Sequence, residues 1–346
     1  MVTTDELRAL LSAAPEPCAE SRRSARERAD SVLRPSNALA QLDDLAVWVA
    51  SWQRRSRPRI DRPVGVVFAG DHGVAAEGVS GYPAEITAAM LQAVRRGQAS
   101  INALAAAAGA ELDVVDVGVG APTGNLRVEP AMTPERFRIA FEAGRAAVTE
   151  CEADLLVLGE LGIANTTSAA AVTAAIIGGP IAAFVGRGTG IDDDMMAVKR
   201  SVVADAVARV CHETDPLEIL RHLGGTELVA MAGAMVEARR CSIPLLLDGY
   251  IATAPALVLH AVAPGLVAHV RAAHRSAEPG HRLALERLGL VPLLTLDFRL
   301  GEGSGAMTAV PIVAAACRVV SDVATFDEFF AAGSTDERGA AGAPGS

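Results

Sequence analysis

Short apolar runs alternate with alanine-rich stretches along most of the chain, from residue 64 onward. The apolar runs are dominated by Val and Leu and lack regular alternation with polar residues, which is typical of parallel strands buried on both faces. We therefore predict strands in the segments VGVVFAG, LDVVDVG, DLLVLGE, IPLLLDG, GLVAHV and LLTLDF.

The stretches between these runs predict helices. Their spans are 83–96, 99–108, 192–211, 215–223, 226–240 and 252–263, with two more that open at Thr133-Pro134 and after Asn165. Asp215, Pro216 and Glu218 supply an N-cap, a first-turn proline and a capping-box acid for one of them. The alternation of strands and helices predicts an α/β fold with a parallel sheet covered by helices on both faces.

The two ends of the chain follow other patterns. The first sixty residues look helical, and 36–52 places its apolar residues close to the 3.6-residue period of a helix. The segment RRSRPRIDRP then reads as a polar linker punctuated by proline. Residues 332–346 predict a disordered tail.

Residues 161–186 carry no charge and are long enough to span a membrane. Their Gly, Ala, Thr and Asn content and a Gly-Gly-Pro break give little tendency to enter lipid. We therefore expect a buried helix packed on the sheet, and no membrane partner.

Composition and charge narrow the class of protein. The chain is 51% hydrophobic and carries a net charge of −10, so it offers no basic field for nucleic acid or an anionic membrane. Five dispersed cysteines without a C-x-x-C pair indicate reduced thiols. The N-terminal MVTTDELRALL carries acids where a secretory signal carries bases, so we expect a cytoplasmic protein.

Polar residues follow several of the predicted strands. In parallel sheets ligands bind at the carboxyl ends of the strands, so these residues are candidates for a site. They are Asp71-His72, Asp116, Glu160, Asp248 and the loop RLGEGSGA, which holds Glu302 between glycines and before a long apolar stretch. A carboxylate is costly to hold where water is scarce unless it is hydrogen-bonded or kept reactive, so Glu302 calls for a function.

Two of these loops leave alternatives open. In GDHGV, Asp71 and His72 could begin a metal site, but no second carboxylate–histidine cluster completes a ligand set, which favours a tight turn whose Asp binds backbone amides. GELGIANTT opens a helix with Asn165, Thr166 and Thr167 as good cap residues, and a helix N-terminus offers free amides to an anion. Spacing alone does not decide whether Glu160 in this loop is functional.

Two further loops carry weaker signals. GRGTG, which comprises Gly186, Arg187, Gly188, Thr189 and Gly190, lacks the spacing of a Walker or Rossmann fingerprint. Its glycines could still let amides approach a phosphate with Lys199 as a point charge, although a solvated loop and lysine would look the same. In HRSAEPGH we expect a loop that lines a site, with Ser276 as a hydrogen-bond donor.

Taken together, GDHGV, GVSGYP, DVGVG, GELGIANTT, GRGTG, LGGTELVAMAGA, LDGY, HRSAEPGH and RLGEGSGA resemble one enzyme family, from about Asn37 to Phe330. It is the nicotinate-nucleotide:5,6-dimethylbenzimidazole phosphoribosyltransferase family of cobalamin lower-loop assembly. The resemblance implies a Rossmann-like catalytic domain, here 61–314, and a small helical domain built from 1–60 and 315–331. It also implies a homodimer without metal or other cofactor.

The resemblance assigns roles to individual residues. Glu302 matches the family's catalytic base, and Glu160 matches a second carboxylate of the active site. Lys199 matches a lysine that contacts the nucleotide phosphate, and GRGTG matches a nucleotide-binding loop; Asn165, Thr166, Ser276 and Gly303 belong to matching motifs that bind substrate. Tyr82, Pro83 and Met90 fall where relatives line the benzimidazole pocket with a serine-proline and a glutamine, and Ala164 replaces a usual glycine or serine.

The implied reaction moves 5-phosphoribose from nicotinate mononucleotide to 5,6-dimethylbenzimidazole or a related base. A pyridinium that leaves becomes neutral and needs no general acid, whereas the incoming azole must lose a proton, so one placed carboxylate suffices. Two other functions remain open at this point. They are a metal-dependent phosphoester hydrolase using Asp71, His72 and Asp248, and a non-catalytic protein that binds a nucleotide or benzimidazole.

Overall fold

The computed structural model describes residues 2–188 and 190–331, which form two compact units. The sheet unit comprises Met1–Pro15 and Arg62–Val310, and the helical unit comprises Glu16–Asp61 and Pro311–Ser346. The sequence placed all of 1–60 in the helical segment, whereas helix α1 (Thr4–Ala13) groups with the sheet unit. The division into functional domains stays a prediction, and the predicted disordered tail lies outside the described residues.

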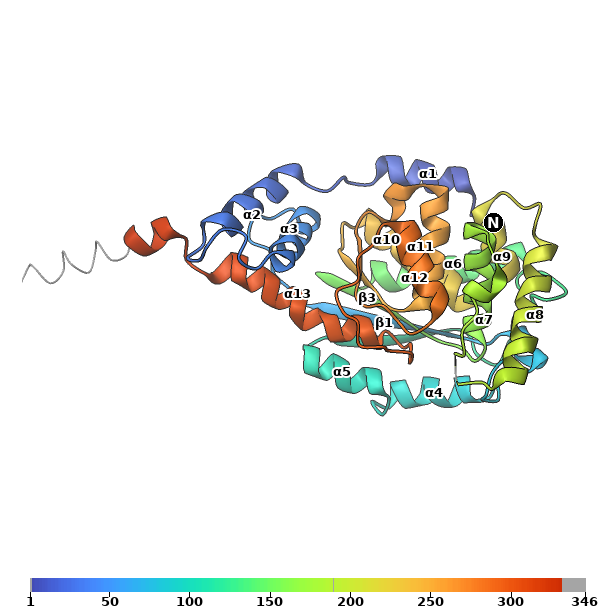
Figure 1. The fold of residues 1–346 in the computed structure, drawn as a ribbon. Helices are drawn as coiled ribbons and strands as arrows, with labels where there is room; N and C mark the ends of the chain where they lie inside the picture. Colours follow the sequence, from blue (N-terminus) through green and yellow to red (C-terminus); the bar gives the residue numbers. More distant parts are fainter. Residues whose placement is uncertain (1, 189, 332–346) are drawn as a thin grey trace, which may run out of the picture. The chain divides into compact units, whose positions relative to one another are not determined.

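The sheet unit is built on five parallel strands in the order β2-β1-β3-β4-β5 (Figure 1). This confirms the predicted α/β fold with a parallel sheet. The strands are β1 (Pro63–Gly70), β2 (Glu111–Gly118), β3 (Leu155–Leu161), β4 (Leu245–Leu247) and β5 (Val270–Ala272). The chain runs from β1 outward to β2 and then back to β3, so the order reverses between β1 and β3, where open α/β sheets bind their ligands.

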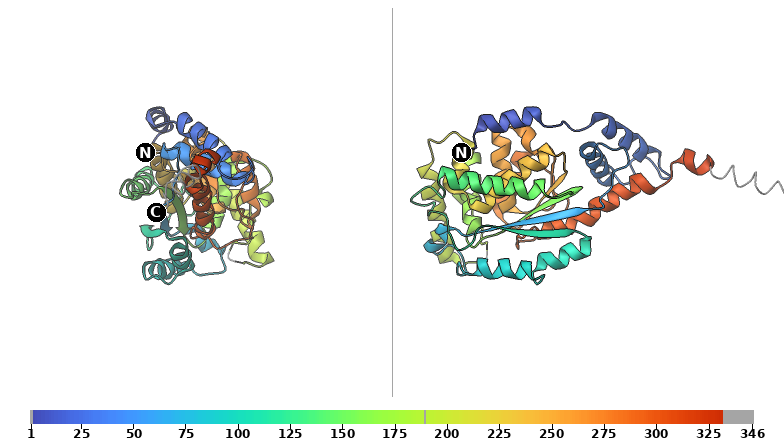
Figure 2. Two further views of the ribbon diagram at one scale, coloured as in Figure 1. Left: turned by 90° about the vertical axis from the view of Figure 1, so that its left-hand side faces the viewer. Right: turned by 180° about the vertical axis from the view of Figure 1, so that it is seen from behind.

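Helices cover both faces of this sheet (Figure 2). On one face lie α4 (Ile86–Arg95) and α5 (Ser100–Ala108), and on the other lie α6 (Pro134–Thr149), α10 (Thr226–Arg240) and α11 (Tyr250–Val262). Four further helices of this unit pack on α11 or on one another. They are α7 (Asn165–Ile177), α8 (Asp193–Arg209), α9 (Pro216–Leu223) and α12 (Pro279–Leu288). Alternate residues of β1, namely Val64, Val66 and Phe68, enter the core beneath α6 and α10.

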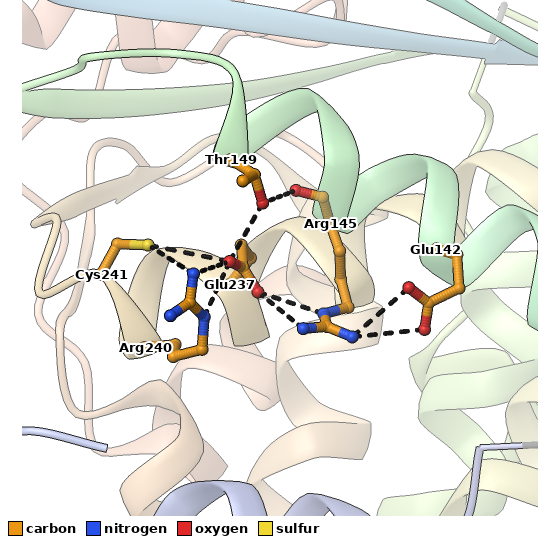
Figure 3. A network of polar contacts seen from close by, with 6 residues as sticks. All are labelled: Glu142, Arg145, Thr149, Glu237, Arg240 and Cys241. Atoms are coloured by element: carbon orange, nitrogen blue, oxygen red, sulfur yellow. Dashed lines mark hydrogen bonds and ion pairs between the residues drawn. The ribbon is translucent and has the colours of Figure 1, made fainter. Parts of the chain in front are cut away.

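The packing of α6 on α10 is close and contains a buried carboxylate. Glu237 of α10 is 1% exposed and accepts hydrogen bonds from Arg145 and Thr149 of α6 and from Arg240 (Figure 3). Burial alone would raise the pKa of Glu237, but these donors hold it below its ordinary value. A buried charge is tolerated here because two arginines and a threonine hydroxyl donate hydrogen bonds to it.

The helical unit contains α2 (Ala19–Ser31), α3 (Gln41–Gln53) and the part of α13 (Ser304–Asp322) beyond Val310. Arg28 of α2 donates to the carbonyls of Val320 and Val323, which ties the N-terminal segment to the C-terminal one. Helix α3 begins five residues later than predicted because Asn37 and Ala40 adopt left-handed backbone angles, with φ of 57° and 43°.

Three sequence predictions were wrong in detail. GLVAHV was predicted as a strand, but Pro264–Val267 forms a 3-10 helix and β5 begins only at Val270. LLTLDF forms no strand and contributes one bridge, between Leu294 and His274. Helix α7 is buried as predicted, but it packs mainly on α8, α9, α11 and α12 rather than on the sheet.

Among the described residues, one helix is long and apolar enough to cross a membrane by length and composition. It is α13, and 61% of its most apolar window is buried within the protein. A core helix passes the same test, so this is weak support for membrane insertion.

Candidate active site

A cavity of about 450 Å³ lies at the carboxyl ends of the strands in the sheet unit. This volume is in the range of small-molecule sites. Its walls come from the loops after β1, β3, β4 and β5 and from the segment before α13. The lining residues are Tyr82, Ile86, Thr87, Met90, 160–166, Gly188, 248–251, His274, Ser276, Glu278 and 298–302.

Glu302 enters the cavity from a left-handed turn. Gly301, Glu302 and Gly303 all have positive φ, at 86°, 64° and 83°. The two glycines adopt this conformation without cost, whereas Glu302 adopts it against its own preference. A Cβ at Gly301 would lie 2.3 Å from Glu160 Oε1, and one at Gly159 would lie 2.3 Å from the Glu302 carbonyl oxygen. Strain of this kind gathers at functional sites, where the surrounding structure enforces it.

The Glu302 carboxylate is nearly closed off from water. The residue is 3% exposed, and its Oε2 has no hydrogen-bond partner. Burial, together with the nearby Asp248, raises the pKa of Glu302 above its ordinary value, although the backbone of Ile101, in the first turn of α5, acts in the opposite direction. The free oxygen is thus a proton acceptor that is more basic than a solvated glutamate.

Glu160, at the end of β3, is the second buried carboxylate. It is 5% exposed and accepts a hydrogen bond from the side-chain amide of Asn165, the first residue of α7. Burial raises the pKa of Glu160 well above its ordinary value, and the charges of Asp248, Glu227 and Glu302 add to the rise. A cationic group placed in the cavity would favour the ionised form of this side chain.

Lys199 is the only lysine in the chain. It is 1% exposed in α8, and its ammonium group donates to Thr166 Oγ1 at 2.9 Å and to the Gly186 carbonyl at 3.1 Å. Burial lowers the pKa of Lys199 to about 8. Lys199 does not line the cavity directly but lies behind Thr166, at the N-terminus of α7. The uniqueness of this lysine is a signal in the sequence that pattern analysis missed.

The backbone at the start of α7 is also strained. Ala164, the N-cap, has a φ of 73°, which explains why glycine suits this position in the family that the motifs resemble. The amides of Asn165 and Thr167 in the first turn of α7 donate to the Gly162 and Ala164 carbonyls, while Asn165 and Thr166 line the cavity at the positive end of the helix. Together with the ammonium of Lys199, they make this end of the cavity suited to an anion.

The GRGTG loop contributes less than predicted. Gly188 lines the cavity, while the Arg187 side chain is half exposed and pairs with Asp193. Gly186 and Gly190 do not line the cavity, and Thr189 lies outside the described residues. Sequence reasoning missed Glu278, whose Oε1 accepts the Gly188 amide at 3.0 Å and whose buried Oε2 has no partner. It stands two residues after Ser276 in HRSAEPGH, a segment whose last residues open α12 instead of remaining a loop.

The other side of the cavity is apolar. Met90 and Ile86 of α4 line it with Tyr82, which is 56% exposed, whereas Pro83 is exposed and does not reach the wall. Gly303 also lies outside the lining and serves the turn that carries Glu302. Soft and flat side chains of this kind fit an aromatic ring.

The residues of the hydrolase alternative each have separate partners. His72 contacts Ser168 Oγ through Nδ1 at 3.0 Å and Glu227 through Nε2 at 2.6 Å. Asp71 accepts the Gly120 amide, as the turn interpretation predicted, and Asp248 accepts the Ala306 amide. Within the part of the chain that the structure describes, no three His, Cys, Asp or Glu side chains are placed to hold a metal ion together.

A model of the family described as phosphoribosyltransferase matches residues 14–329. The chain belongs to this family. Its relatives include nicotinate-nucleotide–dimethylbenzimidazole phosphoribosyltransferases from Ruegeria pomeroyi, 48% identical over 93% of this chain and 96% of the relative, and from Methylorubrum extorquens, 44% identical over 90% and 91%. The resemblance drawn from the motifs is confirmed, and the chain is a transferase of the phosphoribosyltransferase class.

Solved structures agree with this assignment. The crystal structure of CobT from Thermus thermophilus is 46% identical and superposes with a TM-score of 0.86, over 90% of this chain and 98% of that one. A second structure, of the nicotinate-nucleotide-dimethylbenzimidazole phosphoribosyltransferase from the same organism, gives a TM-score of 0.85 at 44% identity. Fold and sequence therefore identify the same family over nearly the whole phosphoribosyltransferase.

Proposed function

We propose that this chain transfers 5-phosphoribose from nicotinate mononucleotide to 5,6-dimethylbenzimidazole or a related base. The products are nicotinate and the α-ribazole 5′-phosphate used in assembly of the cobalamin nucleotide loop. Family membership supports the reaction class, and the names of the relatives support the substrates. The observation that carries the proposal is the buried, partnerless Oε2 of Glu302 inside the cavity.

In the proposed step, one nitrogen of the benzimidazole forms a bond to C1′ of the ribose while the C1′–N bond to nicotinate breaks. The electron pair of the broken bond stays on the pyridine nitrogen and removes its positive charge, so no acid is needed there. Positive charge builds on the benzimidazole, and the proton on its second nitrogen passes to Glu302. A raised pKa makes that carboxylate a better acceptor for the proton.

Other residues are proposed to place the substrates. The phosphate lies at the N-terminus of α7, near Thr166 and the ammonium of Lys199. Glu160 lies on the acidic side of the cavity, where an ionised carboxylate stabilises the cationic ribosyl group as the bond breaks. The benzimidazole occupies the apolar side, against Met90 and Tyr82. Because the resemblance places Tyr82 and Met90 where some relatives carry a serine and a glutamine, we expect them to influence which base is accepted.

We also propose a cytoplasmic homodimer that works without metal or other cofactor. The dispersed cysteines, which indicate reduced thiols, support the compartment. The dimer rests on the resemblance to the family, and light scattering at several protein concentrations would test it.

Incubation with nicotinate mononucleotide, with and without 5,6-dimethylbenzimidazole, tests the reaction. We expect nicotinate release that depends on the base, and a product whose ¹H NMR coupling shows the α-anomer. A binding protein would bind the nucleotide without releasing nicotinate. A hydrolase would release phosphate without any base and would lose activity on chelation.

A further inference from the structure

Behind Ser276 lies a chain of hydrogen bonds that leads away from the cavity. Ser276 lines the cavity, while His281 of α12 is fully buried and does not reach it. The Ser276 amide donates to His281 Nδ1 at 2.9 Å, and Ser276 Oγ lies 2.9 Å from the same nitrogen. Because an amide hydrogen points at Nδ1, this nitrogen carries a lone pair and no proton.

The contacts of the second ring nitrogen, Nε2, lead independently to the same protonation state. His281 Nε2 lies 3.0 Å from Thr253 Oγ1, and the Thr253 hydroxyl donates to the Gly249 carbonyl at 2.7 Å. A hydroxyl has a single hydrogen, so Thr253 can only accept from Nε2. Burial also lowers the pKa of His281 to about 3, which keeps the ring neutral. His281 is therefore the neutral tautomer with its proton on Nε2.

This tautomer fixes the direction of the Ser276 hydroxyl. Nδ1 cannot donate, so a hydrogen bond between the ring and Oγ can only run from the hydroxyl to Nδ1, whose single lone pair is then shared by this hydroxyl and the Ser276 amide. The hydrogen of Ser276 is thus turned away from the cavity, and its oxygen lone pairs face the cavity. We propose that Ser276 acts as a hydrogen-bond acceptor for a hydroxyl group of the bound ribose, with His281 as the positioning residue that sets this polarity. The sequence had suggested the opposite, a donor.

The choice of ligand group rests on the proposed function. The phosphate and the nicotinate carboxylate offer only acceptors when ionised, so they cannot satisfy an acceptor on the wall. The N–H of the benzimidazole is assigned to Glu302. The ribose hydroxyls are the donors that remain in the two substrates.

Deoxy analogues of the nucleotide test the acceptor. For wild-type protein we expect kcat/KM to fall about 10- to 100-fold for either 2′-deoxy or 3′-deoxy nicotinate mononucleotide, because the missing hydroxyl leaves the Ser276 oxygen without its donor. Ser276→Ala should abolish the discrimination at that one hydroxyl and leave the discrimination at the other unchanged. If Ser276→Ala leaves both ratios as in the wild type, the proposal is overturned.

Two replacements separate the role of His281 from general stability. His281→Asn places an amide oxygen near the position of Nδ1 and should keep the discrimination. His281→Phe removes the acceptor, frees the Ser276 hydroxyl to rotate and should weaken the discrimination while Ser276 is still present. His269, also fully buried but outside the cavity lining, provides the matched control His269→Phe, which should leave the discrimination intact.

A spectroscopic readout covers the case in which these variants fail to fold. Long-range ¹⁵N–¹H correlation spectra of the wild type should show His281 as the neutral tautomer protonated at Nε2, and a proton on Nδ1 would overturn the proposal. If the wild type does not release nicotinate, the proposed function fails separately. Calorimetric binding of the nucleotide and its two deoxy analogues would then still test the acceptor.

Discussion

Single ionisable side chains, held away from water, supply the chemistry that the cavity offers. Glu302 has a buried oxygen without a partner, and Lys199 is held by Thr166 and the Gly186 carbonyl. Burial acts on the two in opposite directions, since it raises the pKa of the acid and lowers that of the amine. Both shifts bring the pKa values closer to neutral pH, where a base and a titratable cation are useful.

Replacement of Glu302 by glutamine should stop turnover without loss of binding. Glu302→Gln preserves shape but accepts no proton, so we expect kcat to fall by about 10²–10⁴ while the KM for the nucleotide stays within a few-fold of wild type. Steady-state kinetics with both substrates measures this. Glu150→Gln, which removes an exposed carboxylate, is the control. A kcat near the wild-type value would remove Glu302 from the mechanism.

Lys199 should make nucleotide binding sensitive to alkaline pH. Its pKa of about 8 means that the ammonium is charged below this pH and neutral above it. An anion needs the charged form, so the KM for the nucleotide should rise above about pH 8, and Lys199→Met should show a high KM without that rise. Because the chain has one lysine, selective ¹⁵N-lysine labelling gives a side-chain signal that titrates alone. A midpoint close to the ordinary lysine pKa of about 10.4 would contradict the assignment.

The helices that support the cavity depend on close backbone contacts. In the crossing of α6 with α10, a Cβ at Gly144 would lie 1.8 Å from the Ala230 carbonyl oxygen, and one at Gly233 would lie 2.0 Å from that of Phe141. No side chain fits at either point. These glycines let α10 come close to α6, and α10 in turn packs on β1, β2 and β3.

Gly233→Ala should therefore destabilise the protein. In an exposed helix the same change stabilises by about 1 kcal/mol, but here the added methyl group forces the helices apart at a cost of about 1–3 kcal/mol. Urea unfolding of the protein, followed by circular dichroism, measures the change in the free energy of unfolding. Ala146→Gly, on the exposed side of α6, gives the propensity effect by itself. Stabilisation by Gly233→Ala would show that the contact is not rigid.

The strands and helices were predictable where one local signal dominated. β1 and β3 are continuous apolar runs, and α9 carries its cap, proline and acid in order. GLVAHV and LLTLDF misled because short apolar runs suit a strand, a 3-10 turn or a loop equally, and only packing decides. Of the site, Glu302 and Glu160 stood out as carboxylates in glycine-rich loops. Glu278 and His281 did not, because their roles arise from contacts with Gly188 and Ser276 that form only in the folded chain.

The molecule as a whole is acidic, and so is its cavity. Glu160, Asp248, Glu278 and Glu302 all line the walls of a protein with net charge −10. The acidic groups favour a pyridinium or a developing ribosyl cation over a neutral ligand, whereas a phosphate needs a nearby cation such as Lys199 or Arg299, the second of which lines the cavity. Because these carboxylates repel one another, their ionisation in the absence of a ligand lowers the stability of the folded protein.

The raised pKa of Glu160 should make this loss of stability measurable as a function of pH. Its folded pKa lies well above the unfolded value of about 4.5, so its stabilising contribution is complete below pH 4.5 and is lost as pH rises through the folded pKa. Each unit of that rise lowers the free energy of unfolding by about 1.4 kcal/mol at high pH. Glu160→Gln should therefore raise the melting temperature at about pH 8, with a difference that shrinks toward zero at pH 4.5 and turnover that is lost. Nicotinate mononucleotide, whose pyridinium favours ionised Glu160, should stabilise the wild type more than the variant. If the variant instead melts below the wild type in alkaline buffer, the charge of ionised Glu160 is already compensated in the empty cavity.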